Sequence, residues 1–210
     1  MVLGVLFLLP ITVYLFFASG VNNFAKLPII TEDITDLTNF KNFDSTSITL
    51  NNKITVLGFF GTTVDSKKGN AFNLAHKIYK KNWEFEDFQF VILVTEDQRL
   101  EVQQLKRELA QIADPSNYHF VYGSKMAIEA IFESLETPFI LDTHTASDVV
   151  FIIDKERNLR GRLDDEDVGK LYGYNASDYA EINNKMGDDI KVVLAEYRLA
   201  LKKYKAKRDI

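Results

Sequence analysis

The residues best placed to do chemistry lie in one loop, residues 61–69 (GTTVDSKKG). The loop follows an apolar run, Ile54–Phe60, and precedes a predicted helix, so it meets the unpaired N–H groups and positive dipole of a helix N-terminus. That position suits an anion or a nucleophile. The loop, however, lacks the GK[ST] of a phosphate-binding loop and contains no cysteine or histidine. Asp65 and Ser66 are better interpreted as the cap of the helix.

Cysteine is absent from the chain, which excludes disulfides, thiol nucleophiles and metal–thiolate sites together. The three histidines, His76, His119 and His144, show none of the short spacings that place two imidazoles on one metal. His144 stands in a Thr-His-Thr sequence, and we interpret it as a solvated, hydrogen-bonding residue. The acidic run 164–167 lacks the alternating spacing of a calcium loop and is predicted to be a solvated loop.

The charge balance argues against nucleic acid as a partner. The net charge is −5 and the pI is about 5.3, whereas phosphate binding needs a basic field. Hydrophobic residues make up 46% of the chain, which is enough for a sizeable core.

The first twenty residues form a separate unit. The segment Val2–Ala18 is uncharged and almost wholly apolar, and as a helix it would extend about 26 Å, close to the thickness of a bilayer core. We expect residues 1–20 to anchor the chain in the lipid bilayer. A signal peptide cleaved near Ala18-Ser19-Gly20 is the alternative. Residues 21–47 then form a tether or lead-in, and residues 48–210 form one domain.

The rest of the chain alternates between apolar runs and amphipathic segments. Asn51-Asn52 predicts a hairpin turn between a short strand, 48–50, and the strand Ile54–Phe60. Further strands are predicted at 88–94, 118–122, 149–153 and 159–163, and helices at 70–81, 97–113, 126–135 and 188–208. Leu100, Leu105, Leu109 and Ile112 are expected on the inner side of the second helix. This order predicts an α/β domain: a thioredoxin-like mixed sheet flanked by helices.

Several short pieces, in order, resemble the Sco/SenC family. They are Phe59–Thr62 (FFGT), Val94–Asp97 (VTED), His119–Ser124 (HFVYGS) and, most clearly, Ser147–Arg162 (SDVVFIIDKERNLRGR). The resemblance covers about residues 47–163. It implies a membrane-anchored, extracytoplasmic, thioredoxin-like protein of the kind that delivers copper to cytochrome c oxidase or manages its thiols.

The family's copper site does not carry over. The resemblance places the family's Cys-x-x-x-Cys pair at Val64 and Lys68, and its histidine near Ala146, two residues after His144. Copper(I) prefers soft thiolate or thioether ligands, and one imidazole cannot hold it tightly. We therefore expect no thiol chemistry, no cofactor, no enzymatic activity and no tight copper binding.

The resemblance favours a non-catalytic role. It predicts an accessory or scaffold protein in the assembly or stability of cytochrome c oxidase or a related respiratory complex. The protein would be single-pass in the cell inner membrane, with its domain on the periplasmic side. Two alternatives remain: a metal- or small-ligand-binding protein that uses His144 and the 61–69 loop, or a structural subunit of a respiratory complex.

Overall fold

The computed structural model describes residues 9–14, 26–42 and 46–208, with side chains up to Leu199. Residues 9–14 are helical, and the remainder of the predicted anchor, 1–20, lies outside the described residues. Within the described ranges, no helix has both the length and the apolar character needed to cross a membrane.

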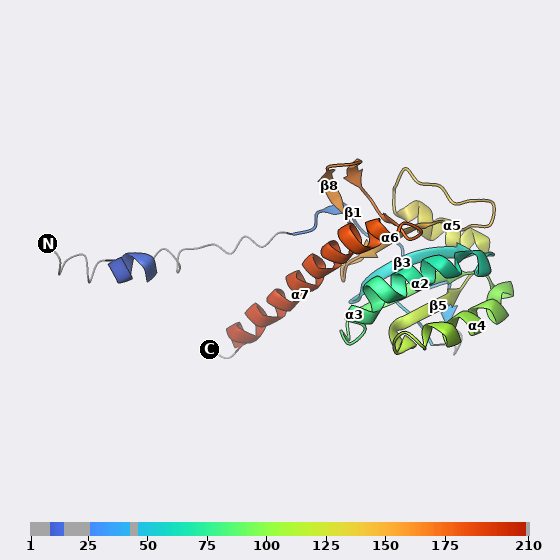
Figure 1. Ribbon diagram of the computed structural model, residues 1–210, viewed down its shortest axis with the longest axis horizontal. Helices are drawn as coiled ribbons and strands as arrows, with labels where there is room; N and C mark the ends of the chain where they lie inside the picture. The colour runs from blue at the N-terminus through green and yellow to red at the C-terminus, as the bar shows by residue number, and fades with distance from the viewer. Residues whose placement is uncertain (1–8, 15–25, 43–45, 209–210) are drawn as a thin grey trace.

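The centre of the domain is a mixed sheet in the order β1-β7-β6-β3-β4-β5-β2. Figure 1 shows the domain and labels β1, β3 and β5 of this sheet. Its three middle strands, β3 (Ile54–Gly61), β4 (Phe88–Val94) and β5 (Tyr118–Tyr122), are parallel. Every residue of β3 and β4 is buried. Their sequences are nearly unbroken apolar runs because helices cover both faces of the sheet.

Antiparallel strands complete the sheet on the other side of β3. Strand β6 (Val149–Ile153) pairs with β3, and both β7 (Leu159–Arg160) and β10 (Tyr174–Asn175) pair with β6. The turn between β6 and β7 is held by the carboxylate of Asp154, which accepts hydrogen bonds from the N–H groups of Glu156 and Asn158.

The lead-in packs on the domain. Strand β1 (Ile29–Thr31) pairs with β7, and β2 (Lys41–Asn42) pairs with β5. Ile34, Leu37 and Phe40 between them are buried in the core. The described part of the lead-in therefore belongs to the sheet, while the three-part division of the chain stays a prediction.

Helices cover both faces of the sheet. One face carries α2 (Lys68–Leu74), its π-helical continuation η2 (Ala75–Tyr79), α3 (Lys80–Asn82), α4 (Arg99–Leu109) and α7 (Gly187–Arg208). The other face carries α5 (Lys125–Ser134) and the lead-in. Short helical turns complete the fold at η1 (Asp65–Lys67), η3 (Glu96–Gln98), η4 (Pro115–Asn117), α6 (Tyr179–Glu181) and η5 (Ile182–Met186). The predicted mixed α/β architecture is confirmed.

Two predicted elements are wrong in detail. Residues 48–50 form no strand, because Asp36 accepts a hydrogen bond from the N–H of Leu50 at 2.8 Å and holds this segment against the lead-in. The helix predicted for 97–113 ends at Leu109. Leu100, expected inside, is 77% exposed, and Val102 occupies the inner face instead.

The acidic connection between β7 and α7 is more ordered than predicted. It forms a separate two-stranded sheet from β8 (Arg162–Asp165) and β9 (Gly169–Leu171), and it supplies β10. The strand predicted for 159–163 is interrupted at Gly161. A Cβ there would lie 2.2 Å from the carbonyl oxygen of Leu171, so only glycine fits this crossing.

Candidate functional site

Four loops meet at the edge of the sheet where the parallel strands end. The N–H of Thr95, after β4, donates to Gly61 O at 3.1 Å, and the N–H of Gly123, after β5, donates to Val94 O at 3.0 Å. The N–H of Thr62 donates to His144 O at 2.9 Å, which joins the end of β3 to the loop before β6. Because parallel strands present their carboxyl ends together, this edge is where ligand sites commonly form in α/β folds.

Gly61 makes the closest of these junctions possible. It has a φ of +48°, and a Cβ on it would lie 2.0 Å from His144 O and 2.6 Å from Thr145 O. No side chain fits at that distance, and few L-residues adopt that φ. The glycine therefore lets the end of β3 contact the backbone of the opposing loop directly.

His144 lies beside the loop that the sequence singled out. Its exposed ring places Nδ1 3.2 Å from the hydroxyl of Thr62. Asp142 fixes the backbone here, because its carboxylate accepts from the N–H groups of His144 and Ala146 at 2.8 and 2.9 Å. The neighbouring Thr145 is buried, with a φ of +56° and a hydroxyl that has no hydrogen-bond partner within the described part of the chain.

Val64 and Lys68, the two residues matched to the family's cysteines, lie in different environments. Val64 is fully buried in the apolar core, and its N–H donates to Gln98 Oε1 at 3.1 Å. The ammonium of Lys68 lies 2.8 Å from the carboxylate of Asp65, and this hydrogen bond raises the pKa of Lys68. Within the described part of the chain, neither side chain forms a hydrogen bond or an ion pair with His144.

The predicted helix cap is also wrong. No side chain caps η1 or α2. Ser66 Oγ donates to Thr63 O at 2.9 Å, and Asp65 pairs with Lys68 instead of with a backbone N–H. The helix begins through a short 3₁₀ turn, which satisfies part of its first turn by backbone bonds.

A polar cluster that the sequence did not indicate lies next to this loop. The carboxylate of Asp148 accepts from Lys67 Nζ and from Asn70 Nδ2, both at 2.7 Å. The hydrogen bond from Lys67, followed by that from Asn70, lowers the pKa of Asp148. Lys67 and Asp148 are far apart in sequence and meet only because β6 pairs with β3, so no local pattern could have revealed them.

Two residues of the acidic run, Asp165 and Asp167, are paired with cations. Asp165 is buried, and Lys185 Nζ lies 2.6 Å from its carboxylate, with Arg162 at 3.2 Å on the other oxygen. The hydrogen bond from Lys185 lowers the pKa of Asp165. The prediction of a solvated acidic loop is wrong at this residue. Within the ranges that the structure describes, no group of three His, Asp or Glu side chains is arranged to hold a metal.

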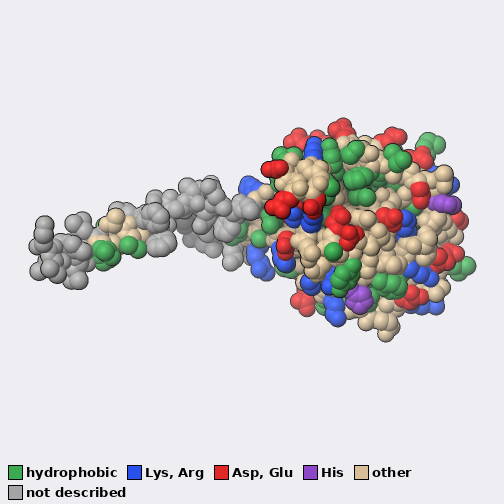
Figure 2. Space-filling model, turned by 45° about the horizontal axis from the view of Figure 1, so that its top comes forward, with side chains coloured by type: hydrophobic (Ala, Val, Ile, Leu, Met, Phe, Trp, Pro, Cys, Tyr) green, Lys and Arg blue, Asp and Glu red, His purple; other side chains and the backbone are tan. Residues whose placement is uncertain are grey.

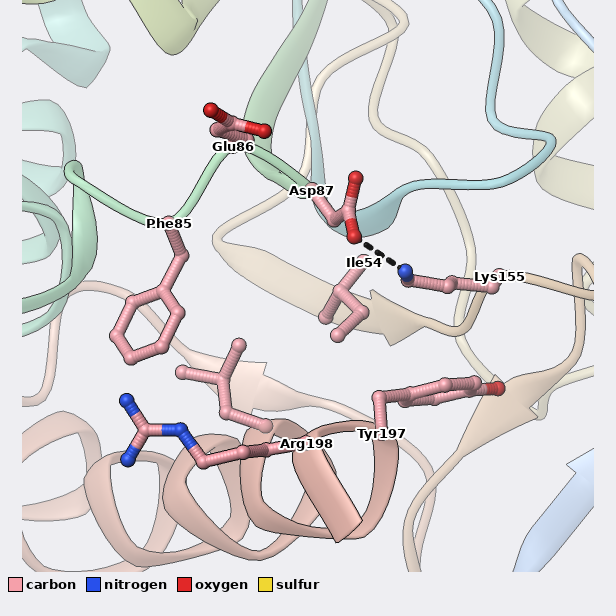
Figure 3. A pocket seen from close by; sticks show the side chains of 8 residues that line it. Ile54, Phe85, Glu86, Asp87, Lys155, Tyr197 and Arg198 are labelled. Atoms are coloured by element: carbon pink, nitrogen blue, oxygen red, sulfur yellow. Dashed lines mark hydrogen bonds and ion pairs between the residues drawn. The ribbon is translucent and has the colours of Figure 1, made fainter. Parts of the chain in front are cut away.

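A cavity of about 200 Å³ lies at the opposite edge of the sheet, between the start of β3 and α7 (Figure 3). It is lined by Ile54, Phe85, Glu86, Asp87, Lys155, Leu194, Tyr197 and Arg198. Both of its cations already interact with neighbouring side chains. Lys155 forms an ion pair with Asp87 at 2.5 Å, and the guanidinium of Arg198 makes a cation–π contact 5.4 Å from the ring centre of Phe85. On the face shown in Figure 2, acidic and basic side chains are interspersed.

Solved structures share this fold. BsSco, described as a member of the Sco family of cytochrome c oxidase assembly proteins, is 12% identical, with a TM-score of 0.53 over 80% of this chain and 98% of its own. A SCO1/SenC family lipoprotein from Bacillus anthracis str. Ames is 15% identical, with a TM-score of 0.55 over 81% of this chain and 99% of its own. No family model and no curated protein matches the sequence. The chain is thus a divergent, cysteine-free protein with the thioredoxin-like fold of the Sco/SenC structures.

Proposed function

We propose that this protein is a non-catalytic, membrane-anchored, extracytoplasmic accessory protein that assists the assembly or stability of cytochrome c oxidase or a related respiratory complex. One observation carries the proposal. The Thr62–His144 junction holds the two loops together, while the positions matched to the cysteine pair hold a fully buried valine and an ion-paired lysine. The edge of the sheet thus keeps its shape without the thiols, which favours contact over chemistry.

The residues present do not fit copper. Copper(I) needs soft donors, and this chain has no cysteine. Val64 offers no donor atom, and the ammonium of Lys68, held by Asp65, would repel a cation. His144 supplies a single imidazole. We therefore assign no step to a metal in this protein.

The partner class rests on the structural neighbours. BsSco is described as belonging to a family of cytochrome c oxidase assembly proteins, and its fold superposes over most of this chain. We assign the contact surface to the exposed residues Thr143 and His144 and the adjoining Thr62. Threonine and histidine at a loop tip can form hydrogen bonds across an interface without a catalytic group.

The test is a pull-down of the full chain from membranes extracted in mild detergent. We expect subunits of a respiratory oxidase, identified by mass spectrometry, to be recovered in substoichiometric amounts. Thr143→Arg should reduce their recovery at least tenfold, whereas Lys170→Glu, at an exposed position in β9, should not. Stoichiometric recovery would identify a structural subunit. Recovery of no respiratory subunit would contradict the proposal.

A second candidate, metal binding at His144, rests on the exposure of its ring beside Thr62. Copper(I) titration of the purified full chain against a competing chelator separates it from the first. The donor set leads us to expect no binding tighter than micromolar. Submicromolar binding that His144→Ala abolishes would replace the accessory role with a metal-binding one.

A further inference from the structure

The end of α7 differs in charge from the rest of the protein. The chain has a net charge of −5, yet residues 202–208 (KKYKAKR) contain five lysine or arginine residues and no acidic residue. The helical backbone extends through this segment to Arg208. Two described cations, Lys191 and Arg198, are exposed on the preceding turns. The helix dipole alone favours cations only within the last turn, so it does not account for a basic stretch of this length.

The start of the lead-in lies against the same helix. The ammonium of Lys26 is 3.9 Å from the carboxylate of Glu196 in α7, and the carbonyl of Leu27 accepts from Arg160 Nε at 2.7 Å. Arg160 also binds Glu196, at 2.6 Å. The point at which the described chain reaches the domain is therefore fixed to the middle of α7.

The length of the intervening chain places the predicted anchor near the basic end. The six residues from the end of the predicted anchor to Lys26 span at most about 20 Å. From Glu196 to Arg208, α7 rises about 18 Å. Figure 1 shows the last turns of α7 projecting beyond the sheet on the side from which the chain reaches β1. The chain from Lys26 back to the predicted anchor and the part of α7 beyond Glu196 can therefore extend similar distances from the same place, the Lys26–Glu196 pair.

A groove with an apolar floor lies between α7 and the segment that holds Asn82 and Phe85. It has a volume of about 370 Å³, and Phe85, Leu194, Ala195 and Leu199 line it together with the cations Lys191 and Arg198. Apolar and basic groups side by side match the boundary between lipid headgroups and acyl chains. Clusters of four to eight Lys or Arg residues near an anchor bind anionic lipid surfaces.

We propose that the basic end of α7, with the groove beside it, docks on the anionic headgroups of the bilayer that holds the anchor. This inference rests on the membrane anchor of the proposed function. Docking fixes the orientation of the domain relative to the bilayer. The candidate-site loops lie at the opposite edge of the sheet from the start of β3, so they face away from the lipid.

The absence of cysteine makes a direct test possible. Ala206→Cys gives the full chain a single site for a fluorophore, and the labelled chain is reconstituted in vesicles of phosphatidylcholine alone or with 30% phosphatidylglycerol. Headgroup-nitroxide lipids quench a fluorophore that lies at the surface. We expect quenching in the anionic vesicles only, and its loss in 0.5 M salt because counterions screen the attraction. A label at Lys68→Cys should remain unquenched.

Charge reversal supplies the matched comparison. Each lysine near an anionic surface contributes about fivefold, so Lys202→Glu, Lys203→Glu and Lys205→Glu together should lower the ratio of docked to undocked chain at least about 100-fold. Lys41→Glu with Lys125→Glu, both exposed at the opposite edge, should leave it unchanged. Equal quenching in both vesicle types, or quenching that the triple variant retains, would refute docking, as would quenching in neither.

The same samples distinguish failure of docking from failure of the anchor. Flotation with neutral vesicles reports the anchor, since no anionic lipid is present. If the chain floats only with anionic vesicles, residues 1–20 do not anchor it, and α7 is its attachment to the membrane. If a soluble acidic protein, and not lipid, protects the label at position 206, α7 is a protein-binding surface and the lipid proposal fails.

Discussion

Thr62 and His144 are joined through both backbone and side chain: the N–H of Thr62 donates to His144 O at 2.9 Å, and the Thr62 hydroxyl lies 3.2 Å from His144 Nδ1. The backbone bond depends on Gly61 and on the turn held by Asp142, and not on the chemistry of the loop residues that follow. This junction therefore makes no use of the side chains at positions 64 and 68.

Gly61→Ala should destabilise the protein. The new Cβ would meet His144 O at 2.0 Å, at a φ of +48° that alanine rarely adopts. We expect the free energy of unfolding to fall by about 2–4 kcal/mol, measured by urea denaturation. The control is Gly69→Ala in α2, where a Cβ has open space and alanine should be neutral or stabilise by up to about 1 kcal/mol. Equal stability of the two variants would contradict the close junction.

Single cysteines at the two matched positions should differ in reactivity. Val64 is fully buried, whereas the side chain of Lys68 is 24% exposed. A disulfide reagent should modify Lys68→Cys rapidly and Val64→Cys about 100-fold or more slowly, because the buried thiol reacts only when the structure opens locally. Both rates should converge in denaturant. Similar rates under native conditions would show that residue 64 faces solvent.

Arg160→Ala should strongly reduce stability. The buried guanidinium bonds to Asp154 at 3.0 Å, Glu196 at 2.6 Å and Leu27 O at 2.7 Å, and so joins β7, α7 and the lead-in. Removing it leaves the buried Asp154 carboxylate without its ion pair, which costs about 3–5 kcal/mol. Lys191→Ala, which breaks an exposed pair with Asp188, should cost less than about 1 kcal/mol. A similar loss in both variants would mean that the Arg160 network contributes no more than a surface pair.

His119 should make stability depend on pH. Burial lowers its pKa from 6.5 to about 4, with Lys106 and Lys53 nearby acting in the same direction. Between these values the unfolded chain binds a proton that the folded chain does not. Stability from this residue is therefore complete above pH 6.5 and falls as the pH drops toward 4, by at most about 3 kcal/mol.

The measurement compares urea unfolding at pH 7.5 and pH 5.0 for the native chain and for His119→Gln. The substitution should remove part of the loss at pH 5.0 while leaving other titrating groups in place. If the difference between the two pH values is the same for both proteins, His119 is protonated in the folded state and its pKa is not lowered.

The buried strands were predictable because each carries its own signal. The runs 54–60, 88–94, 118–122 and 149–153 are mainly apolar, and the structure has strands there within one residue. Strands β1, β2 and β10 were not predictable, since segments of two or three residues show no periodicity. They form by pairing with strands that lie far from them in the sequence: β1 with β7, β2 with β5 and β10 with β6.

The candidate site was predictable only in part. The strand–loop–helix order located the loop, and the resemblance directed attention to His144, but neither showed that Thr62 and His144 touch. The Lys67–Asp148 pair and the burial of Val64 depend on how β6 and α4 pack around the loop. Such contacts between distant segments leave no mark in a single local pattern.

Strand β3 sets a clearance between the two ends of the domain. Its eight residues extend about 26 Å from Ile54, beside the middle of α7, to the loop at Gly61. With α7 docked on lipid, a partner confined to the plane of the headgroups could not reach Thr62 or His144. Only a partner with a portion that extends that far above the bilayer, or one that approaches from the aqueous side, could contact this edge. The length of β3 would thus limit which proteins the domain can bind.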